Sequence, residues 1–237
     1  MNKTKVRLKR VPVHIGIIPD GNRRYARKHG LSLEKSYEIG VEKVKEVLRW
    51  SREFGVKYVT IYALSQENLK NRSKNELNII FKLMKRYLGN ISSDKEIHKN
   101  KVRILIAGET QTLPRDLQDA IINAQNETRD YNHYYLILLI AYGGRQEIIN
   151  AINRILSENR NSKITEETFK KYLYLPNIPY PDLVIRTSGE MRISNFLLWQ
   201  IAYSELYFSK LLWPEFSKEE FIKALTDYQK RERRYGR

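Results

Sequence analysis

Short apolar runs that alternate with longer amphipathic segments constrain the fold of this chain more than any other feature of its sequence. In the first amphipathic segment, Val41, Val44 and Leu48 recur at helical spacing and share one face. Apolar runs of strand length occupy residues 13–18, 58–64, 102–106, 134–140 and 183–186, and residues 204–208 are a candidate sixth. Strands that alternate with helices are typical of a parallel sheet covered on both faces. We therefore expect an α/β fold, a single domain with a mostly parallel central sheet of about six strands flanked by helices.

The segments between the apolar runs predict the helices. We expect them at residues 33–53, 74–98, 117–129, 146–157, 166–172 and 218–233. Gly55 follows the first of them, as a glycine that ends a helix does. No Gly/Ser-rich linker and no internal repeat divides the chain. We therefore expect one domain over residues 1–237, with a basic N-terminal segment at 1–12 and a basic C-terminal tail at 230–237.

The formal net charge of +16 suggests that the protein binds an anionic partner. Hydrophobic residues make up 41% of the chain, enough for a core, which argues against intrinsic disorder. The candidate partners are nucleic acid, anionic lipid and a phosphate-bearing substrate, and a merely basic surface is the alternative. There is no apolar run of about 18 residues, and the basic start breaks too early for a signal peptide. We expect a cytoplasmic protein whose basic ends suit peripheral contact with an anionic membrane.

Several common catalytic motifs are absent from the sequence. The chain has no cysteine, which excludes disulfides, zinc ribbons and thiol nucleophiles. The patterns GxxxxGK, GxGxxG, HExxH and GxSxG are missing, so the sequence has no phosphate-binding P-loop and no ordinary dinucleotide fingerprint. No two aspartates are adjacent, which excludes the aspartate-rich helices of trans-prenyltransferases and terpene cyclases.

Polar residues gather in three clusters that each follow a predicted strand. The first spans residues 19–26 (PDGNRRYA). Its carboxylate, Asp20, can hold a hard cation such as Mg²⁺, and Gly21 lets the backbone approach a ligand. Arg23 and Arg24 stand where a helix could begin, which suits phosphate. An Asp-Gly-Asn turn with solvated arginines is the alternative.

The second cluster is residues 65–68 (SQEN), with Arg72 and Glu76 beyond it; a helix cap supported by a glutamate is the alternative. The third is residues 186–195 (RTSGEMRISN). Arg186 and Arg192 could cradle a diphosphate there, because a guanidinium binds two phosphate oxygens at once, and a polar loop with exposed arginines is the alternative.

These clusters belong together because ligands of open parallel sheets bind beyond the carboxyl ends of the strands. We expect one site for two phosphorylated ligands and a cation. No residue in the clusters is a strong base or a covalent nucleophile. The chemistry that suits them is electrostatic stabilisation of a leaving group.

Four stretches resemble the signatures of one family. Residues 14–26 (HIGIIPDGNRRYA) look like the first signature of the cis-prenyltransferases, the undecaprenyl diphosphate synthase family, and residues 62–68 (YALSQEN) resemble the second. Residues 141–145 (AYGGR) resemble another, and residues 182–208 are a near-continuous match to the last and most diagnostic stretch. The four appear in the family's order along the chain.

The resemblance implies a head-to-tail condensation. The double bond of isopentenyl diphosphate attacks C1 of an allylic diphosphate of farnesyl or geranylgeranyl type, diphosphate leaves, and loss of a proton gives a cis double bond. Repetition makes a long-chain polyprenyl diphosphate, the precursor of a lipid carrier. The implied cofactor is Mg²⁺, and the implied assembly is a homodimer.

The resemblance also implies roles for particular residues. Asp20 is the central catalytic residue and binds Mg²⁺, and Glu205 is a second metal carboxylate near or across a dimer interface. Asn68 stands at the family's candidate proton acceptor, but an amide is a poor base, so a ligand phosphate oxygen is the alternative. The implied substrate-binding residues are Gly21, Asn22, Arg23, Arg24, Tyr25, Ser65, Glu67, Arg72, Arg186, Arg192 and Ser194. Arg234 and Gly236 belong to this set as well, and they form an Arg-x-Gly tail that reaches the active site of a partner subunit.

Some positions depart from the family pattern. Leu33 and Tyr37 stand where an arginine and a histidine are usual, and Leu64 and Leu69 replace aromatic residues. Met191 replaces a common histidine. These departures bear on rate and substrate preference more than on reaction class.

Two other functions fit the sequence less well. A non-catalytic family member that serves as a binding subunit typically lacks the first aspartate, and Asp20 is present. An RNA-binding protein would explain the charge, but the chain has no RRM signature, KH loop or zinc finger. We therefore expect an enzyme with no nucleic-acid partner.

Overall fold

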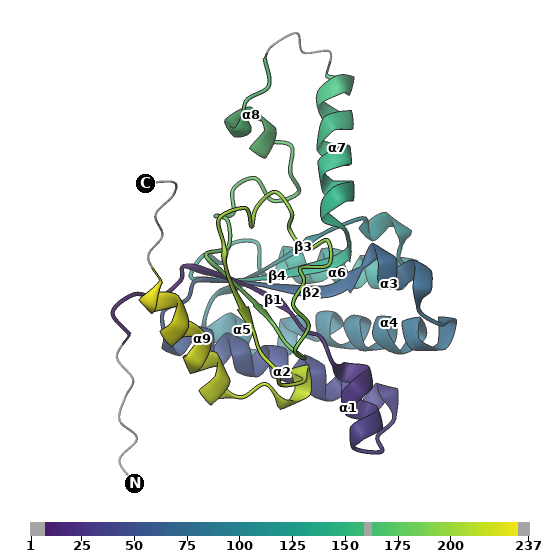
Figure 1. Cartoon of the computed structure of the whole chain (residues 1–237). Helices are drawn as coiled ribbons and strands as arrows, with labels where there is room; N and C mark the ends of the chain where they lie inside the picture. The colour runs from purple at the N-terminus through teal and green to yellow at the C-terminus, as the bar shows by residue number, and fades with distance from the viewer. Residues whose placement is uncertain (1–7, 159–162, 232–237) are drawn as a thin grey trace.

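Six strands form one sheet at the centre of the computed structural model, which describes residues 8–158 and 163–231. They are β1 (His14–Ile18), β2 (Tyr58–Ser65), β3 (Val102–Ala107), β4 (Tyr134–Tyr142), β5 (Leu183–Arg186) and β6 (Glu205–Phe208). The order is β3-β4-β2-β1-β5-β6, and each neighbouring pair is parallel (Figure 1). The predicted α/β fold with a central sheet flanked by helices is confirmed, and the described strands are parallel throughout.

Both faces of the sheet are apolar. Successive side chains of a strand point to opposite faces, so Ile15 and Ile17 of β1 join the core on one side and Ile18 joins the core on the other. In β5, Ile185 and Val184 divide in the same way. Burial of each such side chain stabilises the fold by roughly 1.5–3 kcal/mol. The sheet therefore needs a cover on each face.

Long amphipathic helices cover the first face. They are α2 (Leu33–Glu53), α4 (Lys74–Gly89), α6 (Arg115–Glu127) and α9 (Lys218–Lys230), and each contributes buried residues to the core that contains Ile15 and Ile17. The ends of α2 are set locally. Ser32 accepts a hydrogen bond from the backbone N–H of Lys35, and Gly55, with φ +79°, follows the last turn.

Irregular chain covers the second face, so the sheet is covered on both faces as expected. The core on that side includes Tyr62, Tyr142, Phe196 and Leu197, and within the described residues no helix contributes to it. α7 (Gly144–Ser157) instead projects away from the sheet and packs with α8 (Glu166–Lys170) (Figure 1). The chain that follows α8 is rich in proline, which cannot continue a helix.

The predicted helix at residues 74–98 is wrong as a single element. α4 ends at Gly89, a 3-10 turn η1 (Ile91–Ser93) follows, and α5 (Lys95–Lys99) begins anew where Asp94 caps the backbone N–H of Glu96 and Ile97. Polar residues that can cap a helix interrupt the apolar period at that point. The other predicted helices differ from α6, α7, α8 and α9 only at their ends.

Four short elements complete the described chain: α1 (Asn22–Lys28), α3 (Gln66–Asn71), η2 (Thr110–Thr112) and η3 (Trp213–Glu215). α1 begins within the first polar cluster and α3 begins within the second. Among the helices in residues 8–158 and 163–231, none has the length and apolar character needed to cross a membrane.

Candidate active site

The three polar clusters meet at one edge of the sheet. They follow β1, β2 and β5, which lie side by side in the order β2-β1-β5. Because the carboxyl ends of parallel strands share an edge, residues 186–195 come to lie beside residues 19–26, although more than 150 residues of chain separate them. Ser65, Glu67 and Asn68 of the second cluster line the same cavity.

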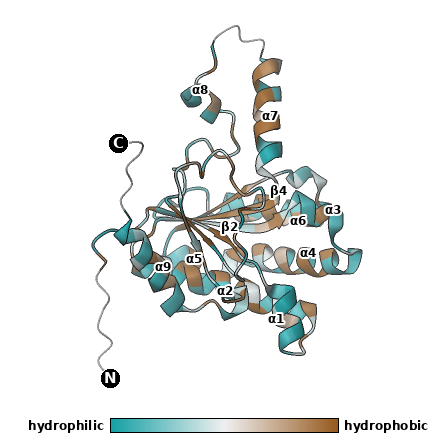
Figure 2. Cartoon of the chain, in the orientation of Figure 1, coloured by the Kyte–Doolittle hydropathy of each residue, from teal (hydrophilic) through white to brown (hydrophobic). Residues whose placement is uncertain are grey.

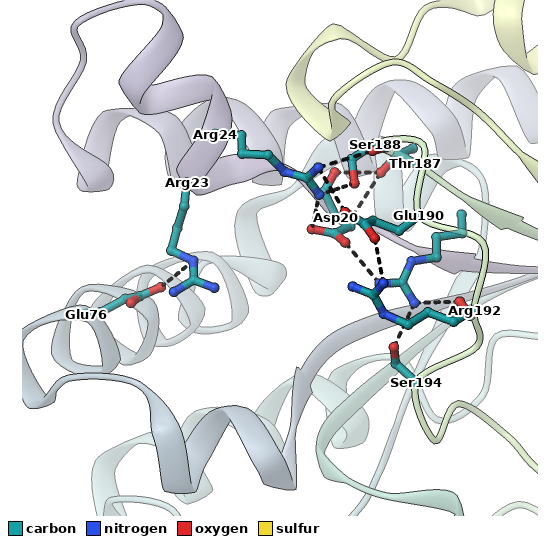
Figure 3. A network of polar contacts seen from close by, with 10 residues as sticks. Asp20, Arg23, Arg24, Glu76, Thr187, Ser188, Glu190, Arg192 and Ser194 are labelled. Carbon is teal, nitrogen blue, oxygen red and sulfur yellow. Dashed lines mark hydrogen bonds and ion pairs between the residues drawn. The ribbon is translucent and has the colours of Figure 1, made fainter.

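Asp20 lies between two arginines at the centre of the site. Its Oδ2 is 3.0 Å from Nη2 of Arg186, and its Oδ1 is 3.3 Å from Nη2 of Arg24 (Figure 3). The hydroxyl of Thr187 donates to the Asp20 carbonyl at 2.7 Å and accepts from the Asp20 N–H at 2.9 Å. The backbone on both sides of the carboxylate is therefore fixed.

The arginines keep the Asp20 carboxylate ionised. Burial alone would raise the pKa of this carboxyl, but the hydrogen bond and charge of Arg186, together with Arg24, outweigh burial and hold the pKa below its ordinary value. Its side chain remains 30% exposed to the cavity. Asp20 thus offers a charged oxygen to a ligand at neutral pH.

Arg186 is the most enclosed cation of the site, with 5% of its side chain exposed. Its Nη1 donates to the carbonyl of Arg192 at 2.5 Å and to Oγ of Ser194 at 2.8 Å. Its Nε is buried with no hydrogen-bond partner among the described residues. This arginine does not match the alternative of a polar loop with exposed cations.

Glu190 joins the other two arginines. Its Oε1 is 3.1 Å from Nη1 of Arg24, and its Oε2 is 2.5 Å from Nη1 of Arg192 (Figure 3). Arg24 also donates to the carbonyl of Ser188 at 3.2 Å and to its Oγ at 2.5 Å. The Arg192 side chain is 61% exposed, so the exposed-arginine alternative holds for this residue.

The remaining residues of the first cluster differ in their placement. Gly21 has φ +114°, and a Cβ there would lie 3.1 Å from the backbone of Leu212, so the turn after Asp20 requires glycine. Asn22 and Arg23 line the cavity. Tyr25 does not line it, and its ring packs against His29 at 4.3 Å between centroids.

The second cluster is a helix start and a cavity wall at once. Oγ of Ser65 accepts from the N–H of Asn68 at 3.1 Å and caps α3, as the helix-cap alternative predicts. Ser65, Glu67 and Asn68 all line the cavity. Oε1 of Glu67 accepts from Nδ2 of Asn195 in the third cluster at 2.8 Å, which ties the two clusters together.

A further polar group surrounds Arg72. The hydroxyl of Tyr37 donates to Oε1 of Glu76 at 2.6 Å and accepts from Nη1 of Arg72 at 2.7 Å. Arg72 also pairs with Glu76 at 3.2 Å, and Arg23 lies 4.0 Å from the same oxygen. From the sequence, Tyr37 stood out only as a departure from the family pattern. The one local signal for this polar group is the spacing of Ser73 and Glu76, which suits a helix cap.

Behind the polar groups, the cavity has a volume of about 1420 Å³ and apolar walls. α2 and α4 contribute Val41, Val44, Leu48, Ile80, Leu83 and Met84 to those walls. From the sequence, Val41, Val44 and Leu48 were predicted only to share one face of a helix. The sequence gives no sign that the core between these two helices and the sheet is hollow.

The structure does not bring every predicted residue to this site. Glu205 begins β6 in register with Leu183, and its Oε2 pairs with Nη1 of Arg231 at 2.8 Å. Arg186 stands three positions after Leu183, so Glu205 lies roughly 10 Å back along the sheet from the ends of the strands. Arg234 and Gly236 lie outside the described residues.

The chain is similar to known proteins over nearly its whole length. The family model described as putative undecaprenyl diphosphate synthase matches residues 18–236. A tritrans,polycis-undecaprenyl-diphosphate synthase (geranylgeranyl-diphosphate specific) from Methanopyrus kandleri is 47% identical over 98% of this chain and 88% of its own length. The enzyme of that description from Thermoplasma acidophilum is 47% identical over 95% of this chain and 89% of its own length.

Two solved structures are similar to this chain over nearly its whole length. Lavandulyl diphosphate synthase from Lavandula x intermedia, in complex with dimethylallyl diphosphate, superimposes with a TM-score of 0.90 at 33% identity and covers 96% of this chain and 99% of its own. A probable undecaprenyl diphosphate synthase from Campylobacter jejuni superimposes with a TM-score of 0.79 at 31% identity, covering 98% and 99%.

Proposed function

The chain belongs to the undecaprenyl diphosphate synthase family, the cis-prenyltransferases, and from this premise we propose that it extends geranylgeranyl diphosphate to undecaprenyl diphosphate. It is a prenyltransferase that condenses isopentenyl diphosphate with an allylic diphosphate, releases diphosphate and makes a long-chain polyprenyl diphosphate. The support for the geranylgeranyl starter is that relatives at 47% and 45% identity carry this specificity in their names.

One observation carries the function: an ionised carboxylate set between two arginines at the mouth of an apolar cavity. A substrate with a diphosphate head and a hydrocarbon tail needs a site with charged groups at one end and apolar walls along the rest. The cavity of about 1420 Å³ gives a growing chain a place out of water.

Two groups of residues are suited to the two diphosphates. Gly21, Asn22, Arg23 and Arg24, with Arg72 from the opposite wall, would hold the allylic diphosphate. Arg186, Arg192 and Ser194 would hold isopentenyl diphosphate. Guanidinium groups bind phosphate with charge-assisted, often bidentate hydrogen bonds, which supports this assignment.

In the reaction, the C1–O bond of the allylic substrate breaks and its electron pair leaves with diphosphate. The double bond of isopentenyl diphosphate forms the new C–C bond, and one proton is lost. Arginines already fixed by Ser188 and Glu190 need little rearrangement as negative charge develops on the leaving group. Because the Asn68 amide is a poor base, we assign the proton to a phosphate oxygen, with Asn68 orienting the substrate.

Mg²⁺ is the cation that fits the donor set. Among the described residues there is no group of three His, Cys, Asp or Glu side chains that could hold a metal by themselves. Magnesium keeps several waters and binds through one or two carboxylates plus substrate phosphates, so the single carboxylate of Asp20 suits it. When bound, the ion would neutralise charge on the allylic diphosphate.

A homodimer is part of the proposal. Glu205 lies away from Asp20 within one chain, so a role for it as a second metal carboxylate requires a partner subunit. Independent support comes from α7, where Ile149, Ile152 and Leu156 are 51%, 41% and 67% exposed. Figure 2 shows hydrophobic positions along this projecting helix. Such an apolar stripe is typical of a helix that packs against another surface.

Peripheral membrane contact completes the proposal. The hydrocarbon product must pass to lipid, and the first ten residues carry five basic and no acidic side chains. A basic residue near an anionic leaflet contributes about 1 kcal/mol. In liposome sedimentation, binding is expected to require anionic lipid and to decline as salt rises. Equal binding to neutral vesicles would contradict an electrostatic contact.

Substitution of Asp20 tests the function. Asp20→Ala is expected to leave less than about a tenth of the wild-type rate, since metal-site stabilisation supplies several kcal/mol. Asp20→Asn keeps the shape beside Arg186 and is expected to lose activity equally, which separates loss of charge from loss of folding. Asp119→Ala removes an aspartate that pairs with an arginine four positions away, as Asp20 does, but outside the cavity, and it is the control. Both Asp20 variants retaining activity would refute the assignment.

A further inference from the structure

Asn195 contacts two other segments of the chain. It lies in the loop that follows β5, one residue after Ser194. Its carbonyl accepts from the N–H of Gly144 at 2.8 Å, and its Oδ1 accepts from the N–H of Arg145 at 2.9 Å. Its Nδ2 donates to Oε1 of Glu67 at 2.8 Å. One residue thus joins the loop that follows β5, the start of α7 and the start of α3.

The backbone around Asn195 is held in a conformation that few residues adopt. Ser194, Asn195 and Leu197 have φ angles of +47°, +65° and +40°. Asparagine tolerates the left-handed region better than most residues, but a run of such angles persists only where surrounding contacts enforce it. Strain of this kind is typical of segments whose exact position matters.

The glycine pair of the AYGGR motif makes room for Asn195. A Cβ on Gly143 would lie 2.8 Å from Nδ2 of Asn195, and a Cβ on Gly144 would lie 3.0 Å from its carbonyl oxygen. A side chain at Gly143 would displace the Asn195 amide, whereas one at Gly144 would also clash with Leu198, whose Cγ and backbone N would lie 2.8 and 2.9 Å from the added Cβ. The two glycines of the motif are therefore required by packing, independently of any contact with substrate.

Glu67 depends on this contact for its position. Its side chain is exposed to the cavity, so an unrestrained carboxylate would sample several rotamers. Tyr62 and Ser65 of β2 and Lys70 of α3 are the other groups near the carboxylate, and α7 presents Arg145 to the same cavity. Burial would raise the pKa of Glu67, but hydrogen bonds from its own backbone, Asn195 and Ser65 lower it. The amide of Asn195 thus favours the ionised, fixed carboxylate.

We infer that Asn195 is a positioning residue that fixes the Glu67 carboxylate relative to the isopentenyl-binding residues Arg186 and Ser194, so that the two substrates meet in register. Arg186 Nη1 donates to Oγ of Ser194 at 2.8 Å, next to Asn195, so the loop and Glu67 are linked through two adjacent residues. The inference rests on the proposed function, since it assigns a task within the same condensation.

Asn195→Asp tests this with almost no change in shape. The new carboxylate keeps the acceptor for the Arg145 N–H but places an oxygen 2.8 Å from the Glu67 carboxylate, where a donor had been. We expect kcat to fall about ten- to a hundred-fold, the range for loss of a hydrogen bond to a charged group, with much smaller changes in either KM. We also expect activity to recover partly on the acid side, where the new pair shares a proton.

Asn150→Asp is the matched control. Nδ2 of Asn150 donates to Oε1 of Glu109, so the same substitution creates the same clash of two carboxylates outside the cavity. It is expected to leave kcat and its pH profile close to those of the wild type. Asn195→Gly tolerates the positive φ while removing the side chain, and it should lose kcat as Asn195→Asp does.

Titration of Glu67 can be measured without enzyme turnover, so it tests the role of Asn195 independently of the proposed function. In carbon-detected NMR of labelled glutamates, with Glu67→Gln for assignment, Glu67 should titrate at a higher pH in Asn195→Gly than in the wild type. An inactive wild-type enzyme would overturn the proposed function and leave this titration standing. An active wild type with kcat unchanged in both Asn195 variants, or an unmoved Glu67 titration, would overturn the role of Asn195.

Discussion

Tyr37 is a residue whose role follows from its contacts and not from its type. A histidine is usual at its position in the family, and a histidine can carry charge near neutral pH. Burial raises the pKa of the Tyr37 hydroxyl, so it stays neutral. It therefore contributes geometry: its hydroxyl lies between Glu76 and Arg72 and holds the Arg72 guanidinium at the cavity.

We predict that Tyr37→Phe raises KM for the allylic diphosphate about five-fold, because loss of one such hydrogen bond costs about 1 kcal/mol. Arg72 keeps its ion pair with Glu76, so kcat should change less. Initial-rate kinetics with each substrate varied in turn provide the measurement. Tyr172→Phe is the control, since that hydroxyl donates to Glu158 beside Arg154 away from the cavity. A change confined to the isopentenyl KM would contradict the assignment of Arg72 to the allylic site.

At the scale of elements, the serine N-caps of two helices determine where polar side chains of the site are placed. Ser65 caps α3 and Ser73 caps α4. The first cap places Asn68 at the cavity, and the second places Glu76 against Tyr37 and Arg72, which line it. Each cap contributes about 1 kcal/mol to its helix. α7 differs from the other long helices because it leaves the sheet and exposes the stripe of Ile149, Ile152 and Leu156.

Charge placed on that stripe tests the dimer. Ile152→Glu is expected to convert the proposed dimer to a monomer, because a glutamate cannot be buried there without a partner. Sedimentation velocity gives the mass directly. Ile122→Glu is the control: Ile122 is 51% exposed, compared with 41% for Ile152, but it lies on α6, outside the stripe. A dimer that survives the α7 substitution would exclude this helix as the contact.

At the scale of the whole molecule, a buried histidine links stability to pH. His14 is 2% exposed, and its ring contacts the carbonyl of Pro179 at 2.6 Å and the hydroxyl of Thr60 at 2.7 Å. Burial lowers the pKa of His14 from 6.5 to about 4. In the unfolded chain the ring binds a proton near pH 6.5, whereas in the folded protein it does so only near pH 4. Stability is therefore full above neutral pH and is lost as pH falls from 6.5 toward 4.

We predict that the free energy of unfolding falls by about 2 kcal/mol between pH 7 and pH 5 through this one group. Urea denaturation at the two pH values measures the difference. His14→Gln should lower stability at pH 7 but remove this part of the slope. His133→Gln, at an exposed position, should leave the slope as it is. An identical slope in the His14 variant would show that other groups cause the acid sensitivity.

The sequence by itself determined the strands, most helices and the three clusters. Residues 33–53 and 183–186 were predicted to the residue, because hydrophobic period, capping residues and glycine are local signals. The family motifs identified Asp20, Arg186 and their neighbours for the same reason: each motif is a continuous stretch. The break after Gly89 was missed because the apolar period resumes after only a few polar residues.

Only the tertiary structure decided how these pieces meet. The order β2-β1-β5 brings Arg186 within 3.0 Å of Asp20, and that order depends on packing between distant parts of the chain. The cavity between α2, α4 and the sheet has the same sequence pattern as a filled core. The contact of Asn195 with Glu67 joins residues 128 positions apart. Periodicity states which way a side chain points, but the distance between two elements is set by the sum of contacts that hold them, which no local pattern contains.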